Sequence, residues 1–200
     1  MLDAKLPERL DPWLVKLLTP FSKNGINPNF LTLMGLLLSF LASLGIIFDR
    51  IILAGVIILI AGGFDILDGA AARIFKKATP FGKFLDSVVD RYSDTFVCLG
   101  LMVYFSLRGQ TGNLILTGVV LLGCILIPYT KAKAETLIGK CNIGIMERPE
   151  RVILLSLGLI FNIITPVLWI LAILCHITVF QRIFYTRKRL HSGARRNNKC

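Results

Sequence analysis

The stretch DILDGAAARIFKKATPFGKFLDSVVD, residues 65–90, places four aspartates inside two segments that otherwise have the composition of membrane helices. A carboxylate in hydrocarbon costs about 2.5–3.5 kcal/mol even on the lenient insertion scale. Ionisable side chains at such positions are therefore typical of functional sites. The stretch indicates a helical hairpin with a functional site between its two arms.

The composition of the whole chain is that of a polytopic membrane protein. Of its 200 residues, 54% are hydrophobic and only 18% are charged, and the mean hydropathy is +0.70. A soluble domain has about a quarter of its residues charged and could not bury this much apolar surface. The formal net charge is +11, but no nucleic-acid-binding motif accompanies it. We therefore expect basic loops that face anionic lipid headgroups and no nucleic-acid partner.

Apolar segments predict an all-α fold with six transmembrane helices. Most of the segments have the roughly 17–25 residues that a membrane span needs, and the fifth is short and predicts a tight hairpin with the sixth. The predicted spans lie near residues 30–48, 51–75, 82–107, 113–138, 150–163 and 166–186.

Residues 6–22 predict a short amphipathic helix ahead of the first span, with Trp13, Leu17 and Phe21 on one face. Such a helix would lie in the membrane interface, although an ordinary helix packed on protein fits the same pattern. The predicted organisation is a cytoplasmic N-terminal segment (1–24), a transmembrane domain (25–186) and a basic cytoplasmic tail (187–200).

The distribution of lysine and arginine predicts the orientation of the chain. The connections on one side of the six predicted spans contain only Arg50 and Arg108, so the other 21 of the 23 basic residues lie on the opposite side. Basic residues collect in cytoplasmic loops. We therefore expect an integral membrane protein with both termini and the aspartates on the cytoplasmic side.

The spacing of the four aspartates is nested about the turn KKATP. Asp65 and Asp68 are three residues apart, and Asp86 and Asp90 are four apart, so each pair shares one helix face. Thr79 is a candidate N-cap for the second arm. Folding the chain near residue 77 brings Asp68 level with Asp86 and Asp65 level with Asp90, so four carboxylates meet at two depths.

Four clustered carboxylates repel one another unless cations lie among them. Oxygen ligands suit hard cations such as Mg²⁺, Ca²⁺ or Mn²⁺, and two divalent ions would balance the four charges. Two-metal sites orient phosphoryl groups and stabilise attacking and leaving oxygens. Aspartates that cap helices or pair with Lys76, Lys77 and Lys83 remain an alternative, but they do not explain the nested spacing.

Small residues lie beside the aspartates. Gly69, Ala72 and Gly82 remove side-chain bulk, which allows a ligand to approach the backbone closely, or a neighbouring helix to pack there. Arg73 lies in the same window and has the planar guanidinium that binds a diphosphate bidentately.

The motif formed by these residues resembles that of the CDP-alcohol phosphotransferase family at all eight fixed positions. That family displaces CMP from a CDP-linked lipid by an alcohol and leaves a phosphodiester. The resemblance implies two Mg²⁺ or Mn²⁺ ions, a homodimer, and a general base at Asp90. It implies metal ligation by Asp65, Asp68, Asp86 and, in addition, Asp90. It implies contacts to the CDP-lipid by Asn29, Thr32, Asp65, Asp68, Gly69, Ala72, Arg73 and Gly82.

The stretch KAKAETLIGKCNIGIMERPER, residues 131–151, supplies basic residues on the same side as the aspartates. Several ammonium and guanidinium groups around one pocket suit a phosphorylated acceptor, although the cytoplasmic charge bias alone would also place them there. Arg182 ends the last span on this side. The predicted acceptor-phosphate residues are Lys131, Lys133, Arg148, Arg151 and Arg187.

The pieces KAKAE and ERPER also resemble the family branch that makes phosphatidylinositol phosphate and archaetidylinositol phosphate. This resemblance implies inositol 1-phosphate as the acceptor and CDP-diacylglycerol or CDP-archaeol as the donor. Branches that use glycerol 3-phosphate or serine remain alternatives. A divalent-cation transporter is a further alternative, but it would need acidic residues through the depth of the membrane, and only Asp49 lies at the far end.

Overall fold

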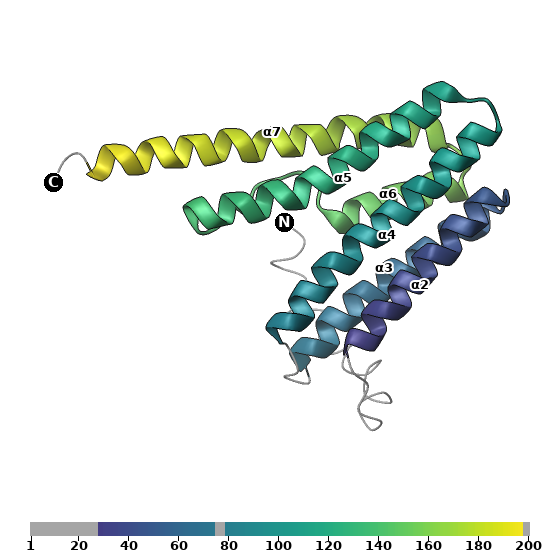
Figure 1. Cartoon of the computed structure of the whole chain (residues 1–200), viewed down its shortest axis with the longest axis horizontal. Coiled ribbons are helices and arrows are strands. Elements are labelled where there is room, and N and C mark those ends of the chain that lie inside the picture. Colours follow the sequence, from purple (N-terminus) through teal and green to yellow (C-terminus); the bar gives the residue numbers. More distant parts are fainter. Residues whose placement is uncertain (1–27, 75–78, 198–200) are drawn as a thin grey trace.

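The computed structural model describes residues 28–74 and 79–197, and over these residues it contains helices and no strand. The predicted interfacial helix at residues 6–22 lies outside the described residues. So do the side chains of Asp68, Ala72 and Arg73, although their backbone is helical. The helices are α2 (Pro28–Ile47), α3 (Ile51–Ile74), α4 (Pro80–Leu107), α5 (Thr111–Ile138), α6 (Arg148–Ile160) and α7 (Ile164–Asn197) (Figure 1).

The all-α prediction is confirmed, and the largest difference in boundaries is at α7. The last span was predicted to end at 186, whereas α7 continues to Asn197 and projects beyond the end of α5 (Figure 1). Hydropathy predicts where the apolar residues of a segment end, whereas the helical backbone can continue into polar residues. Residues 187–197 contain no proline, so the helix continues into the basic region.

The chain is a membrane protein by the composition of its helices. Among the described residues, three stretches are long and apolar enough to cross a bilayer: Asn29–Ile47, Thr111–Ile138 and Ile164–His191. Helix α6 has only 13 residues, or about 20 Å, which is shorter than the roughly 30 Å hydrocarbon core. The other helices carry the aspartates or are short, so the count of six spans stays a prediction.

Large apolar side chains lie on the outside of the helices as well as inside. Phe30, Leu53 and Phe180 are each more than half exposed. On a water-soluble protein such apolar surface would be a liability, whereas in a bilayer it contacts lipid.

Within the described residues, α4 faces both α3 and α6 across the interior without backbone contact to either. Helix α2 packs against α3 and α4, α5 packs against α4 and α7, and α6 packs against α3 and α7 (Figure 1). Within the described residues, the backbones of α4 and α6 make no direct packing contact. Side chains alone therefore connect α4 with α6.

The start of α4 fixes the axial position of its aspartates. The Thr79 Oγ1 accepts a hydrogen bond from the Gly82 N–H at 2.9 Å, and Pro80 is the first helical residue. This is the N-cap that the sequence predicts. Asp86 and Asp90 consequently follow in the second and third turns of α4.

Gly100 allows α4 to approach α2 closely. A Cβ atom at this position would lie 2.6 Å from the Ser43 Oγ and 2.8 Å from the Ser43 carbonyl oxygen. The second of these is a backbone atom, so the helices would have to move apart.

We expect Gly100→Ala to destabilise the protein by about 1–3 kcal/mol, because the added methyl group overpacks the contact between α2 and α4. The matched control is Gly118→Ala, where a Cβ would meet only the Met102 Cε at 4.0 Å. Both changes raise helix propensity equally. Thermal unfolding in detergent measures the difference, and an equal midpoint for the two variants would contradict the prediction.

Candidate functional site

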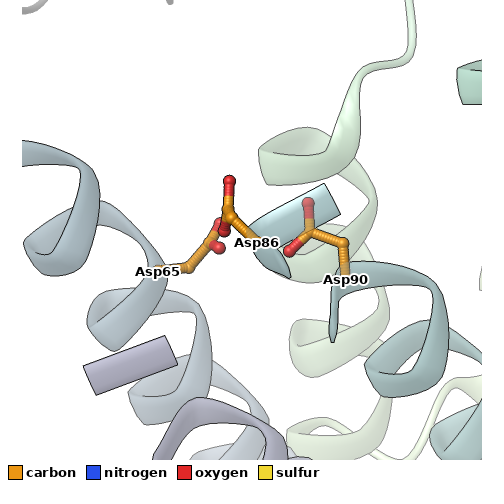
Figure 2. Close-up of side chains that lie close together, drawn as sticks. All are labelled: Asp65, Asp86 and Asp90. Atoms are coloured by element: carbon orange, nitrogen blue, oxygen red, sulfur yellow. The ribbon is translucent and has the colours of Figure 1, made fainter. Parts of the chain in front are cut away.

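Three carboxylates converge where α3 faces α4. One oxygen each from Asp65, Asp86 and Asp90 lies within 4.8 Å of the others. Figure 2 shows Asp65 on α3 pointing toward Asp86 and Asp90 on α4. The structure thus brings these three aspartates together, although the backbones of α3 and α4, within the described residues, make no direct packing contact. The side chain of Asp68 lies outside the described residues, so its place opposite Asp86 stays a prediction.

Arg148, in the first turn of α6, reaches into this carboxylate group. Its Nη1 lies 2.5 Å from the Asp65 Oδ2 and 2.6 Å from the Asp90 Oδ1. The guanidinium therefore lies between two carboxylates that would otherwise repel each other. Its side chain is only 18% exposed, so solvent screens these contacts weakly.

Asp94 extends the row of acidic residues on α4 by one more turn. Its Oδ2 accepts a hydrogen bond from the Arg151 Nη2 at 2.8 Å, and its Oδ1 lies 3.7 Å from the Arg148 Nε. The family motif ends at Asp90, so Asp94 was not among the predicted site residues. The available signal was the four-residue spacing, which continues from Asp86 through Asp90 to Asp94.

A cavity of about 330 Å³ lies beside these groups. It is bordered by carboxylates from α3 and α4 and by basic side chains from α4, α5, α6 and α7. The charged residues that line it are Asp65, Asp86, Asp90, Arg91, Asp94, Lys131, Glu147, Arg148, Arg151 and Arg182.

Glu147 and Arg182 hold the connection between α5 and α6 against α7. The sequence did not predict the contacts that these two side chains make. The Arg182 side chain is 1% exposed and donates hydrogen bonds to the carbonyl oxygens of Ile127 and Ile143. Its Nη2 lies 3.4 Å from the Glu147 Oε1, which is also 3.5 Å from the Lys131 Nζ. Lys131 and Glu147 thus form an ion pair that lines the same cavity as the aspartates.

The structure separates the five predicted acceptor-phosphate residues into two groups. Lys131, Arg148 and Arg151 line the cavity with the aspartates, whereas Lys133 and Arg187 line a different groove between α5 and α7. Lys133 follows Lys131 by two residues, which turns it about 200° around the helix. Lys131 and Lys133 lie in the same sequence stretch, but helix geometry places them on different faces of α5.

The predicted CDP-lipid residues that are described lie at the same end of the molecule. The Asn29 Oδ1 would be 3.4 Å from a Cβ added at Gly82, so the starts of α2 and α4 are adjacent. Gly69 lines the large cavity. Thr32 is buried and lines, together with Asp65, a small inner cavity of about 50 Å³.

The carboxylates fit a divalent cation. Among the described residues, the Asp86 Oδ1 and the Asp90 Oδ1 are buried and have no hydrogen-bond donor. The Asp90 Oδ1 is close to the Arg148 Nη1, but the two are not aligned for a hydrogen bond. Buried carboxylate oxygens without donors, grouped within 4.8 Å, are the ligands that hard divalent ions take.

Comparison with known proteins identifies the family to which these features correspond. A model of the CDP-alcohol phosphatidyltransferase family matches residues 26–181. The chain is 38% identical to the archaetidylinositol phosphate synthase of Pyrococcus horikoshii over 170 residues, which cover 84% of this chain and 88% of that protein. It is 31% identical to the phosphatidylinositol phosphate synthase of Mycobacteroides abscessus over 172 residues, which cover 82% and 78% of the two chains.

Solved structures match the helical arrangement over 86% of the chain. The crystal structure of the phosphatidylinositol phosphate synthase of Mycobacterium tuberculosis with CDP-DAG bound gives a TM-score of 0.79 at 27% identity, covering 86% of this chain and 92% of that one. The same protein in complex with manganese and citrate also gives 0.79, at 28% identity and with 86% and 88% of the two chains covered.

We expect Asp86→Asn to weaken Mn²⁺ binding at least about tenfold, because loss of a second-shell partner alone costs 10–100-fold in metal affinity and this change removes a charged ligand. A titration of detergent-solubilised protein followed by electron paramagnetic resonance of free Mn²⁺ measures it. The control is Asp49→Asn, because Asp49 pairs with Arg108 at the opposite end of the helices. Unchanged Mn²⁺ affinity in Asp86→Asn would remove Asp86 from the metal site.

Proposed function

We propose that this chain, which belongs to the CDP-alcohol phosphatidyltransferase family, transfers the phosphatidyl-type group of a CDP-linked lipid to inositol 1-phosphate and releases CMP. One observation carries the proposal. A group of three carboxylates and a pair of arginines, Arg148 and Arg151, face the same cavity. The first suits a diphosphate held through divalent cations, and the second suits an anionic acceptor.

The donor half of the proposed site combines acidic and small residues. Mg²⁺ or Mn²⁺, in two sites held by Asp65, Asp68, Asp86 and Asp90, would neutralise the diphosphate and stabilise the attacking and leaving oxygens. Gly69 and Gly82 leave room for the nucleotide next to the backbone. The remaining residues proposed to contact the CDP-lipid are Asn29, Thr32, Ala72 and Arg73.

Asp90 is the proposed general base. Its carboxylate takes the proton of the acceptor hydroxyl while the hydroxyl oxygen attacks the phosphorus that carries the lipid. The bond from that phosphorus to the bridging oxygen breaks, and the oxygen leaves with CMP. Asp90 lies at the border between the carboxylate group and the arginines, where a hydroxyl of a bound acceptor would have to be.

Buried hydrogen-bond donors support a phosphorylated acceptor. In the described part of the chain, the Nε atoms of Arg148 and Arg151 are buried without a hydrogen-bond acceptor. Buried polar groups in proteins are nearly always hydrogen-bonded, and phosphate oxygens would satisfy these donors. Lys131 lines the same cavity and adds a further positive charge.

The names of similar proteins favour an inositol phosphate among the candidate acceptors. The relatives compared above are named as synthases of phosphatidylinositol phosphate or archaetidylinositol phosphate. Because both names occur, the donor tail is proposed as diacylglycerol or archaeol. Glycerol 3-phosphate is the second candidate acceptor, since it offers the same phosphomonoester to the arginines.

The proposed reaction takes place at the cytoplasmic surface of a protein with six spans and both termini in the cytoplasm, as the basic residues indicate. The homodimer implied by the family resemblance is part of the proposal. The basic end of α7 is proposed to contact anionic lipid headgroups.

A competition assay tests the proposed function. Purified protein in detergent receives Mg²⁺ and either CDP-diacylglycerol or CDP-archaeol, together with inositol 1-phosphate, glycerol 3-phosphate, serine or free inositol, and CMP release is measured. We expect release with inositol 1-phosphate and none above background with free inositol. Release with glycerol 3-phosphate alone would keep the reaction and reject the proposed acceptor.

We expect Lys131→Ala to raise the KM for the phosphorylated acceptor about 10-fold or more, because a hydrogen bond to a charged group contributes about 1.5–3 kcal/mol. Lys133→Ala is the matched control and should leave this KM within about twofold, since Lys133 lies outside the cavity and exposed charges contribute little. Steady-state kinetics with saturating CDP-lipid measures both. Equal effects of the two changes on this KM would contradict the assignment of Lys131, but not Lys133, to the cavity with the aspartates.

A further inference from the structure

The two helices that carry the acidic row and the arginines are joined only through their side chains. Within the described residues, α4 and α6 make no direct backbone packing contact, and the ion pairs of Arg148 and Arg151 cross the space between them. The direction in which these two side chains point is therefore set by their anionic partners. This makes the carboxylates on α4 determinants of how an acceptor would bind.

Asp94 differs from the other carboxylates in the cavity. Its oxygens lie outside the group of three that could hold a metal ion, and it contacts both arginines, with one oxygen directed to each. Asp65 and Asp90, by contrast, contact Arg148 alone of the two. Asp94 is thus the one described carboxylate shared by Arg148 and Arg151.

We propose that Asp94 is a positioning residue that holds Arg148 and Arg151 across the cavity as a two-pronged binding site for the acceptor phosphate. This inference rests on the proposed function and deepens it. Arg151 is tied to the Asp94 Oδ2 through its Nη2, which leaves its Nε as a buried donor without a partner. The Nε of Arg148 is also buried and unpartnered and lies 3.7 Å from the Asp94 Oδ1.

Electrostatics explain why a separate carboxylate is needed for this task. Divalent cations on Asp65 and Asp90 would repel the guanidinium of Arg148, because like charges at such separations disfavour each other. Asp94 lies one turn further along α4, outside the group that could hold a metal ion, so its carboxylate stays available to pair with both arginines. Arg148 and Arg151 are three residues apart on α6 and Asp90 and Asp94 four apart on α4, so both pairs face each other at matching depths.

The alternative is that Asp94 only neutralises the buried charge of Arg151, whose residue is 6% exposed. In that case a substitution would reduce the amount of folded protein but would not separate the acceptor from the CDP-lipid. A positioning role predicts a selective effect on the acceptor. The kinetic constants of the two substrates therefore distinguish the two roles.

The test compares Asp94→Asn with wild-type enzyme, using whichever phosphorylated acceptor the wild type accepts. We expect the KM for the acceptor to rise at least about tenfold, because loss of the carboxylate leaves both arginines without the anion that positions them, while the KM for CDP-lipid changes less than about twofold. A second readout is calorimetric binding of the same phosphorylated acceptor to protein kept in EDTA. We expect its Kd to rise by a similar factor.

Two further variants complete the test. Asp94→Glu keeps the charge and should recover part of the acceptor affinity, giving a KM between those of wild type and Asp94→Asn. Asp49→Asn breaks another Asp–Arg pair of 2.8 Å, to Arg108, and should leave both KM values unchanged. Asparagine tolerates the positive φ of 64° at Asp49, so this control keeps its backbone.

Parallel changes in both KM values, or no change in either, would overturn the inference while the proposed function stands. If Asp94→Asn does not fold, Asp94→Glu alone tests the positioning role, because its extra methylene displaces the carboxylate. An acceptor KM equal to that of wild type in Asp94→Glu would then reject the positioning role. A wild-type enzyme that uses glycerol 3-phosphate in place of inositol 1-phosphate changes only the acceptor named in the proposed function. A wild-type enzyme that uses only unphosphorylated alcohols would overturn both.

Discussion

Neutralisation of the carboxylates on α3 and α4 is the constraint on which the rest of the structure depends. Asp65, Asp86 and Asp90 place three negative charges within 4.8 Å of one another, in a protein whose outer surface is apolar. Charges so grouped persist only with cations among them. Arg148 supplies one such cation, and the buried Asp86 Oδ1, which has no hydrogen-bond donor, is available as a ligand for another. The chain therefore needs α6 to begin with an arginine directed at the hairpin between α3 and α4.

The arrangement of the other helices follows from keeping this charged region open. Because α6 packs on α3 and α7 rather than on α4, the space between α4 and α6 remains a cavity that charged side chains border. Arg182 secures the connection between α5 and α6 to α5 itself, because it donates to the carbonyl oxygens of Ile143 in the connection and Ile127 within α5. With its guanidinium buried, this arginine holds Glu147, and through Glu147 also Lys131, at the edge of the cavity.

The sequence predicts the site where local helix geometry alone determines it. The nested spacing of the aspartates follows from an antiparallel hairpin, so Asp65 was expected beside Asp90, and Thr79 caps α4 as its position before Pro80 suggests. The role of Asp94 could not be predicted in this way, because its partner Arg151 is 57 residues distant in the chain. The separation of Lys131 from Lys133 likewise depends on which face of α5 meets the cavity. Local sequence patterns predict which residues share a helix face, but only the packing of the helices shows which faces contact one another.

The electrostatics that would hold cations at the carboxylates would also give the arginine side of the proposed site a preference for anions. A neutral alcohol in the cavity would leave the unpartnered N–H groups of Arg148 and Arg151 buried and unsatisfied, at a cost of about 1–3 kcal/mol for each group. A phosphomonoester would satisfy them and place its hydroxyls toward Asp90. Selectivity would then arise from the penalty on the wrong acceptor as much as from attraction to the right one. In the proposed reaction the charged row on α4 would thus serve both substrates, with its outer turns directed to the cations and its inner turn to the arginines.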